Sequence, residues 1–159
     1  MPKVILICGP ICCGKTTYAH QLRQRCKAVL LSCDEIMLSL LDEHQGEQHD
    51  LYARKTEQYL LQKSLEILES GIDVILDWGP WTRAGREKLR SFYERKGIAF
   101  ELHAIRVDEA EWRRRIASRN RQIDEGCCLA YHVDAGLEVK FTSVYQIPQM
   151  DEVDVWIDG

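Results

Sequence analysis

Residues Gly9 to Thr16 read Gly-Pro-Ile-Cys-Cys-Gly-Lys-Thr and match the pattern G-x-x-x-x-G-K-[S/T]. An apolar run, Lys3–Cys8, comes directly before them, and a helical pattern, Thr16–Cys26, comes directly after. In this order the glycines let backbone N–H groups turn inward and form an anion-binding nest at the N-terminus of the helix. The segment therefore predicts a phosphate-binding loop (P-loop) inside an α/β domain.

Two side chains of this loop predict what it binds. Lys15 can reach the β- and γ-phosphates of a nucleoside triphosphate, and the Thr16 hydroxyl is placed to ligate Mg²⁺. Backbone N–H groups of the loop supply the other phosphate contacts. We therefore expect ATP and Mg²⁺ as cofactors, with the nucleotide held by Gly9, Pro10, Ile11, Cys12, Cys13, Gly14, Lys15, Thr16 and Thr17.

Short apolar runs alternate with helical patterns along the whole chain. Runs without clear polar alternation are typical of parallel strands covered on both faces, and strands that alternate with helices indicate an α/β domain. Asp50 and Asp108 are expected N-caps. The predicted strands are Lys3–Cys8, Ala28–Ser32, Ile72–Asp77, Ala99–Val107 and Val153–Ile157, and the predicted helices are Thr16–Cys26, Asp50–Ser70, Thr82–Lys96, Asp108–Arg121 and Asp134–Tyr145.

Composition narrows the class of protein. The chain has 159 residues, of which 45% are apolar, which suits one compact domain with a hydrophobic core. A formal net charge of -4 argues against a protein whose main role is to bind duplex nucleic acid. No apolar run approaches the ~20 residues of a membrane span. Seven cysteines, an odd number that includes adjacent pairs, fit a cytoplasmic protein without disulfides, and their spacing matches no zinc site.

Landmarks along nearly the full length resemble the small P-loop kinases grouped as zeta-toxin-like or AAA_33-type proteins, which include polynucleotide 5′-kinases and chloramphenicol phosphotransferase. The resemblance implies a five-stranded parallel sheet in the order 2-3-1-4-5 with helices on both faces. It also implies one domain over residues 1–159, a helical lid around residues 111–132, and transfer of the γ-phosphoryl group of ATP to a hydroxyl. The landmarks are Gly9–Thr17, Leu31–Asp34, Gly71–Asp77, the helix with Arg86, Leu89 and Gly97, the pair Arg115 and Arg119, and Pro148–Val155.

Two aspartates follow predicted strands, where open α/β sheets place ligand-contacting groups. The resemblance implies that Asp34 is the base that orients and deprotonates the acceptor hydroxyl, and that Asp77 is a Walker-B carboxylate near Mg²⁺. From the residues alone, Asp34 can instead cap the helix that starts at Glu35, and Asp77 can be a solvated strand-end residue. Glu35 is a weaker carboxylate candidate, as a first-turn helix charge.

An arginine-rich helical segment follows the fourth predicted strand. Arg115 and Arg119 are four residues apart, so they share one helix face. By resemblance they align with lid arginines, one of which would neutralise charge on the migrating phosphoryl group. A solvated basic face is the alternative, and a shift of one turn would pass these roles to Arg113, Arg114 or Arg121.

The acceptor side departs from the polynucleotide kinases, which have D-x-x-R where this chain has Asp34-Glu35-Ile36-Met37. Met37 cannot grip a phosphate on the acceptor, which favours a neutral small molecule over a nucleic-acid end. Trp78 and Trp81 lie just past Asp77 and predict an aromatic wall of the acceptor pocket. They can equally stack a nucleobase or pack the loop onto the domain.

These features together predict a cytoplasmic ATP-dependent kinase that phosphorylates a small hydroxyl-bearing molecule. Two other hypotheses stay open. One is a kinase acting on nucleic acids or nucleotide conjugates, including a toxin, which the arginine-rich helix keeps open. The other is a non-catalytic nucleotide-binding regulator, against which Lys15, Thr16, Asp34 and Asp77 speak. The pattern leaves the acceptor and the oligomeric state undetermined.

Overall fold

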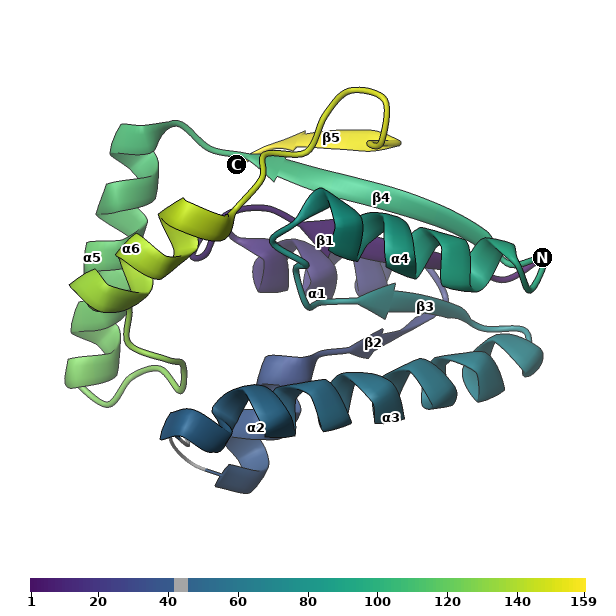
Figure 1. Cartoon of the computed structure of the whole chain (residues 1–159), viewed down its shortest axis with the longest axis horizontal. Helices are drawn as coiled ribbons and strands as arrows, with labels where there is room; N and C mark the ends of the chain where they lie inside the picture. The colour runs from purple at the N-terminus through teal and green to yellow at the C-terminus, as the bar shows by residue number, and fades with distance from the viewer. Residues whose placement is uncertain (42–45) are drawn as a thin grey trace.

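The computed structural model describes residues 1–41 and 46–159. Each predicted strand is present, although β5 begins two residues later than predicted. Helix α2 is an addition to the five predicted helices. In chain order the elements are β1 (Lys3–Cys8), α1 (Lys15–Arg25), β2 (Ala28–Leu31), α2 (Cys33–Leu41), the short 3₁₀ helix η1 (Gly46–Gln48), α3 (His49–Glu69), β3 (Asp73–Leu76), α4 (Arg83–Glu94), β4 (Ala99–Arg106), α5 (Glu109–Asp124), α6 (Ala135–Val144) and β5 (Val155–Asp158) (Figure 1).

The five strands form one parallel sheet in the order β2-β3-β1-β4-β5. This arrangement confirms the strand order that the family resemblance implied. In the centre of the sheet, Val4 of β1 lies between Val74 of β3 and Phe100 of β4. Because the strands are parallel, their carboxyl ends meet at one edge of the sheet. Figure 1 shows α5 and α6 standing off this edge.

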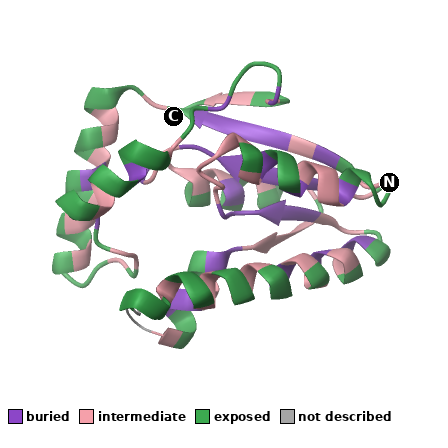
Figure 2. Cartoon of the chain, in the orientation of Figure 1, coloured by how far each residue is buried: buried purple, intermediate pink, exposed green. Residues whose placement is uncertain are grey.

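The two faces of the sheet carry separate apolar clusters, because side chains along a strand point alternately to opposite faces. On β1, Val4, Leu6 and Cys8 pack with residues of α3 and α4. Ile5 and Ile7 of the same strand pack with residues of α1 on the other face. All five side chains are buried, and Figure 2 shows the central strands as the most buried part of the fold. Helices on both faces explain why the strand sequences do not alternate with polar residues.

Helix starts follow the expected capping chemistry in one case and not in the other. The Asp108 carboxylate accepts a hydrogen bond from the backbone N–H of Glu111 at 2.9 Å, which confirms it as the N-cap of α5. The predicted cap at Asp50 is wrong, because η1 precedes α3 and the helix already begins at His49. Asp50 therefore lies in the first turn of α3, where the helix dipole favours a negative charge.

Helices α5 and α6 and the residues between them, 109–144, are here called the lid segment. Its own small apolar cluster includes Ile116 and Val133, which pack with Cys12 of the P-loop. Asn120 joins the two parts of the segment, since its amide donates to the carbonyl oxygen of Val133 at 2.8 Å and accepts from the same residue's N–H at 2.9 Å. The segment thus rests on the P-loop rather than on the faces of the sheet.

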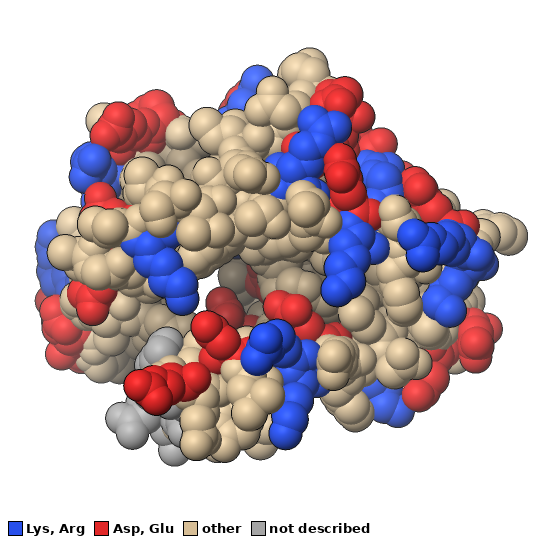
Figure 3. Space-filling model, in the orientation of Figure 1, with Lys and Arg blue, Asp and Glu red and all other residues tan. Residues whose placement is uncertain are grey.

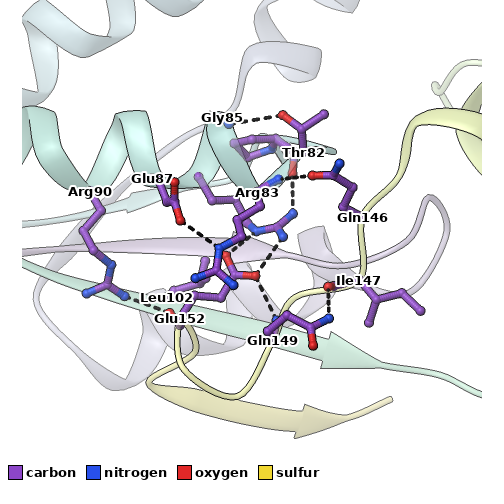
Figure 4. A network of polar contacts seen from close by, with 12 residues as sticks. Thr82, Arg83, Gly85, Glu87, Arg90, Leu102, Gln146, Ile147, Gln149 and Glu152 are labelled. Carbon is purple, nitrogen blue, oxygen red and sulfur yellow. Dashed lines mark hydrogen bonds and ion pairs between the residues drawn. The ribbon is translucent and has the colours of Figure 1, made fainter.

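A buried ion pair fastens α4 to the segment before β5 (Figure 4). Arg86 donates two hydrogen bonds to the Glu152 carboxylate, at 2.8 and 2.9 Å, and the exposed fractions of the two side chains are 1% and 6%. Arg86 also contacts the carbonyl oxygen of Pro80 at 3.4 Å. This pair therefore holds the loop that leads away from the end of β3. Within the described ranges, no helix has both the length and the apolar character that crossing a membrane requires.

Candidate active site

The P-loop joins β1 to α1 and has a backbone that only glycine fits at two positions. A Cβ atom on Gly9 would lie 2.6 Å from the Cys13 sulfur and 3.1 Å from the carbonyl oxygen of Ile105. Gly14 has φ 103°, a conformation that side-chain-bearing residues rarely adopt. The non-glycine residue Cys12 also has a positive φ, of 59°. The loop is therefore a tight turn directly before the N-terminus of α1, as an anion nest requires.

The two loop side chains predicted to meet phosphate and metal point to different partners. The Lys15 ammonium donates to the carbonyl oxygens of Gly9 at 3.1 Å and Pro10 at 2.7 Å, so it folds back over the loop. The Thr16 hydroxyl donates to the Asp77 carboxylate at 2.8 Å. The structure thus brings Thr16 and Asp77 together, as the prediction of a shared metal site requires.

Asp77 follows β3 directly and is 5% exposed. Burial raises the pKa of its carboxyl group, while the hydrogen bond from Thr16 and the charge of Lys15 act in the opposite direction. The alternative of a solvated strand-end aspartate is therefore wrong. A hydroxyl and a carboxylate side by side are hard oxygen donors of the kind that Mg²⁺ takes, usually from one or two carboxylates together with phosphates and water. The residues present fit this ion.

Asp34 lies in the first turn of α2, at the carboxyl end of β2. Ser32, and not Asp34, caps this helix, because its hydroxyl accepts a hydrogen bond from the N–H of Glu35 at 3.3 Å. The capping alternative for Asp34 is thus corrected, and its carboxylate is left for another task. Asp34 is an exposed residue whose side chain lines a cavity. Desolvation by the cavity walls and the charge of Asp77 raise the pKa of Asp34, against the opposing charges of Lys15 and Arg119.

A cavity of about 620 Å³ gathers these groups at the carboxyl ends of β2 and β3. Figure 3 shows the molecule hollowed in this region, with acidic side chains around the hollow. Carboxylates from α2, from α3 and from the segment after β3 line it, and so do residues of the lid segment opposite them. Among the lining residues are Thr16, Ser32, Asp34, Glu35, Asp50, Asp77, Trp81, Arg119, Tyr131 and Lys140.

Of the arginines on α5, two face the P-loop. Arg115 donates to the carbonyl oxygen of Cys13 at 2.7 Å and pairs with Glu111 at 2.6 Å. Arg119 lines the 620 Å³ cavity and also a second one of about 480 Å³ on the other side of the loop. The alternatives lie elsewhere: Arg113, Arg114 and Arg121 are exposed, and the first two pair with surface glutamates.

The structure corrects two of the three predicted acceptor-pocket residues. Met37 is 2% exposed and Trp78 is 8% exposed, and both belong to the core cluster under α3 and α4 rather than to the cavity lining. Met37 points inward because α2 packs on α3, where the Thr56 hydroxyl contacts its sulfur at 3.6 Å. Its apolar nature therefore carries no information about the acceptor. Trp81 does line the cavity and meets Phe141 of α6 edge-on at 5.1 Å between ring centroids.

Sequence reasoning missed several polar residues of the cavity. His20 lies one helical turn after Thr16 on α1, so the spacing from the P-loop could have placed it on the same face. Lys140 and Tyr131 come from α6 and from the connection before it. No sequence signal identifies these two, because their positions depend on how the lid segment folds back over the sheet.

The strand order, the phosphate-binding loop between β1 and α1, and the carboxylates at the ends of β2 and β3 define a small P-loop protein of the kinase type. The family model described as an AAA domain, AAA_33, matches residues 4–127. Because this match spans most of the chain, the protein belongs to the AAA_33 family. A search of curated protein sequences finds no match.

Solved structures share the fold at low sequence identity. A candidate kinase of Chloroflexus aurantiacus J-10-fl superposes with a TM-score of 0.73 at 19% identity, covering 99% of this chain and 86% of that one. A gluconokinase of Sinorhizobium meliloti 1021 gives 0.65 at 16% identity, covering 99% and 82%. The APS kinase CysC of Mycobacterium tuberculosis, solved with AMPPNP and APS, gives 0.57 at 15% identity, covering 99% and 88%. This protein is thus a P-loop protein of the AAA_33 family that shares the fold of these kinases.

Proposed function

We propose that the protein transfers the γ-phosphoryl group of ATP to a hydroxyl group of a small molecule bound in the 620 Å³ cavity. One observation carries this proposal. The same cavity is lined by Asp34, by the hydrogen-bonded pair Thr16 and Asp77, and by Arg119, next to the P-loop. A protein that only binds nucleotide does not need the Asp34 carboxylate in the cavity beside the P-loop, whereas a kinase needs such a group to accept the proton of the acceptor hydroxyl.

The P-loop would hold the β- and γ-phosphates, with the Lys15 ammonium exchanging its two carbonyl contacts for phosphate oxygens. Thr16 and Asp77 would hold Mg²⁺, which when bound neutralises charge on the phosphate oxygens. Among the residues that the structure describes, no group of three or more His, Cys, Asp and Glu side chains could hold a metal ion by itself. This agrees with an ion that needs the nucleotide to complete its coordination.

Asp34 would act on the acceptor. Its carboxylate accepts the proton of the acceptor hydroxyl as that oxygen forms a bond to the γ-phosphorus, while the bond from this phosphorus to the β–γ bridging oxygen breaks and ADP leaves. A pKa raised by desolvation in the cavity and by Asp77 makes Asp34 a stronger base than an aspartate with the ordinary pKa. Arg119, from the lid side of the cavity, would stabilise the charge of the transferred group.

The lining of the cavity supports a small, uncharged acceptor. A volume of about 620 Å³ lies in the range of small-molecule sites. Asp34, Glu35, Asp50 and Asp77 all line it, so a polyanion would meet like charges there. Trp81 gives an apolar wall on which the carbon face of a ring could pack. These features favour hydroxylated compounds such as sugars, nucleosides or hydroxylated antibiotics over nucleic-acid ends.

Radiolabelled phosphate transfer from ATP tests the proposal directly. Wild-type protein and Asp34→Asn are assayed with one panel of neutral hydroxyl compounds and one of 5′-hydroxyl oligonucleotides. We expect labelling in the first panel, and a rate for Asp34→Asn lower by about 10²–10⁴-fold with MgATP affinity retained. Labelling confined to the oligonucleotides would contradict the proposed acceptor class. Equal rates for wild type and Asp34→Asn would contradict the role of Asp34 as base.

A further inference from the structure

Two side chains of the lid helix α5 donate hydrogen bonds to carbonyl groups of the P-loop. The indole Nε1 of Trp112 donates to the carbonyl oxygen of Ile11 at 2.6 Å. The Arg115 guanidinium donates to the carbonyl oxygen of Cys13 at 2.7 Å. The two carbonyls lie on either side of Cys12, the non-glycine residue of the loop that has a positive φ. Such a conformation persists where its surroundings impose it, and these two contacts are placed to do so.

Because the peptide bond is planar, these two contacts also determine which way the neighbouring N–H groups of the loop point. The peptide bonds of the described residues are trans, so the C=O of one residue and the N–H of the next point in opposite directions. With the Ile11 carbonyl held toward α5, the N–H of Cys12 points away from that helix. In the same way, the contact to Cys13 turns the N–H of Gly14 away from α5. Neither N–H has a protein acceptor in residues 1–41 and 46–159, so both are available to an anion.

We propose that Trp112 and Arg115 are positioning residues for the phosphate cradle. By holding the carbonyls of Ile11 and Cys13 outward, they orient the N–H groups of Cys12 and Gly14 toward the nucleotide phosphates. The inference rests on the proposed function in one respect, namely that this loop binds the phosphates of ATP. It adds that phosphate affinity depends on α5 lying against the loop, so the lid segment and the cradle act as one unit.

Trp112 is the better of the two residues to test, because substitution by Phe removes the N–H donor and keeps an aromatic ring. Its ring packs with Ile11, Ile116 and Leu137 and lies 5.8 Å from the Phe141 ring, which leaves the apolar contacts largely in place in Trp112→Phe. The donor to Ile11 is lost, together with the part of the indole ring that phenyl does not replace. A matched control is Trp156→Phe on β5, where the indole N–H that is removed has no acceptor within the described residues.

The experiment compares the dissociation constants of MgATP and of adenosine for wild type, Trp112→Phe and Trp156→Phe, with adenosine measured by competition. Losing one hydrogen bond that orients the loop should weaken MgATP binding by about two- to tenfold in Trp112→Phe. Adenosine, which has no phosphate, should bind as it does to wild type, and Trp156→Phe should resemble wild type for both ligands. Arg115→Gln should lose MgATP affinity in the same direction, which keeps the test valid if Trp112→Phe folds poorly.

The outcomes separate this inference from the proposed function. If wild-type protein binds MgATP and Trp112→Phe binds it equally well, the positioning role is wrong and the proposed function stands. Equal losses of MgATP and adenosine affinity would also overturn the inference, because they indicate a general loss of structure. If wild-type protein binds no MgATP, the proposed function itself fails.

Discussion

Asp34 lies where its own charge is disfavoured. Desolvation by the walls of the cavity and the nearby Asp77 raise its pKa, and the charges of Lys15 and Arg119 offset this only in part. A raised pKa means that the folded protein binds a proton more tightly than the unfolded chain does. The free energy of unfolding therefore decreases as pH rises from the unfolded pKa through the folded one. A carboxylate that destabilises the fold at neutral pH is typical of a functional site.

Asp34→Asn should therefore raise the melting temperature at neutral pH, because the amide carries no charge to be desolvated. The gain should shrink as pH falls from the raised pKa of folded Asp34 to the ordinary pKa of an aspartate, and vanish below it, since the wild-type carboxyl group is then protonated too. Thermal melts of both proteins across pH measure this difference. Glu69→Gln, which removes an exposed carboxylate at the last residue of α3 and outside the cavity lining, serves as the control and should change little. A lower melting temperature for Asp34→Asn at neutral pH would show that Asp34 stabilises the fold.

The transfer reaction should lose rate on the acid side at a higher pH than an aspartate with the ordinary pKa would give. The base must be deprotonated, and desolvation together with Asp77 raises the pKa of Asp34. The measurement is kcat/KM against pH with a working acceptor. An acid limb at or below the pKa of ordinary aspartate would assign the base to another group. The pKa of Asp77 is raised as well, so the acid limb of the profile reports on Asp34 and Asp77 together.

The sequence predicted some residues of this site correctly and misplaced others, and each outcome has a physical reason. The P-loop was predictable because each position is fixed by backbone geometry or by phosphate contact. Thr16 and Asp77 were predictable because one opens a helix and the other ends a strand. Met37 was misplaced because its position three residues after Asp34 suggests a shared face, whereas packing of α2 on α3 turns it into the core. A linear pattern cannot show which side of a short helix the next helix will cover.

At the scale of elements, the buried pair Arg86 and Glu152 is the main polar link between α4 and the chain before β5. Burial alone would raise the pKa of Glu152, but hydrogen bonds from Arg86 and from the backbone of Gln149 hold it below its ordinary value. The pair thus contributes stability above the unfolded pKa of the carboxyl group, and this contribution is lost as pH falls. It also holds the carbonyl of Pro80, one residue before Trp81 in the cavity wall.

Arg86→Met should lower the free energy of unfolding by about 3–5 kcal/mol, because it leaves the Glu152 carboxylate buried without its partner. Adding Glu152→Gln to this variant should recover part of the loss. The matched control is Arg83→Met on the same helix, whose ion pairs with Asp151 and Glu87 are exposed and should contribute far less. Urea unfolding of the four proteins gives these differences. Similar losses of unfolding free energy for Arg86→Met and Arg83→Met would show that burial does not make the Arg86–Glu152 pair more important for stability than an exposed pair.

The elements themselves were largely predictable, and their junctions were not. The five parallel strands were predictable from unbroken apolar runs that alternate with helical patterns. Strands covered on both faces need apolar side chains throughout. The sequence suggested α2 only as a helix that starts at Glu35 with Asp34 as its cap, whereas the helix starts at Cys33 and only Ser32 separates it from β2. The start of α3 moved from Asp50 to His49 because η1 leads directly into it. These junctions depend on local backbone contacts that composition does not encode.

At the scale of the whole molecule, the cavity exists only where three parts of the chain meet: the sheet edge with the P-loop, the α2–α3 pair, and the lid segment. The first part was predictable from the sequence, and the last was predicted as two helices and, by resemblance, as a lid, but not as the opposite wall of the cavity. The fold is shared with kinases of solved structure at 15–19% identity. Binding of nucleotide at the P-loop is the step on which every proposed role depends.

Thermal melting with and without MgATP tests that step most directly. A ligand that binds only the folded protein stabilises it by RT ln(1 + [L]/Kd), about 2.7 kcal/mol at a concentration of 100 Kd. We predict that millimolar MgATP raises the melting temperature of the wild-type protein. Lys15→Ala, which removes the ammonium from the loop, should show a clearly smaller rise. Identical melting curves for wild-type protein with and without MgATP would contradict the assignment of the P-loop as an ATP site, and with it the proposed kinase.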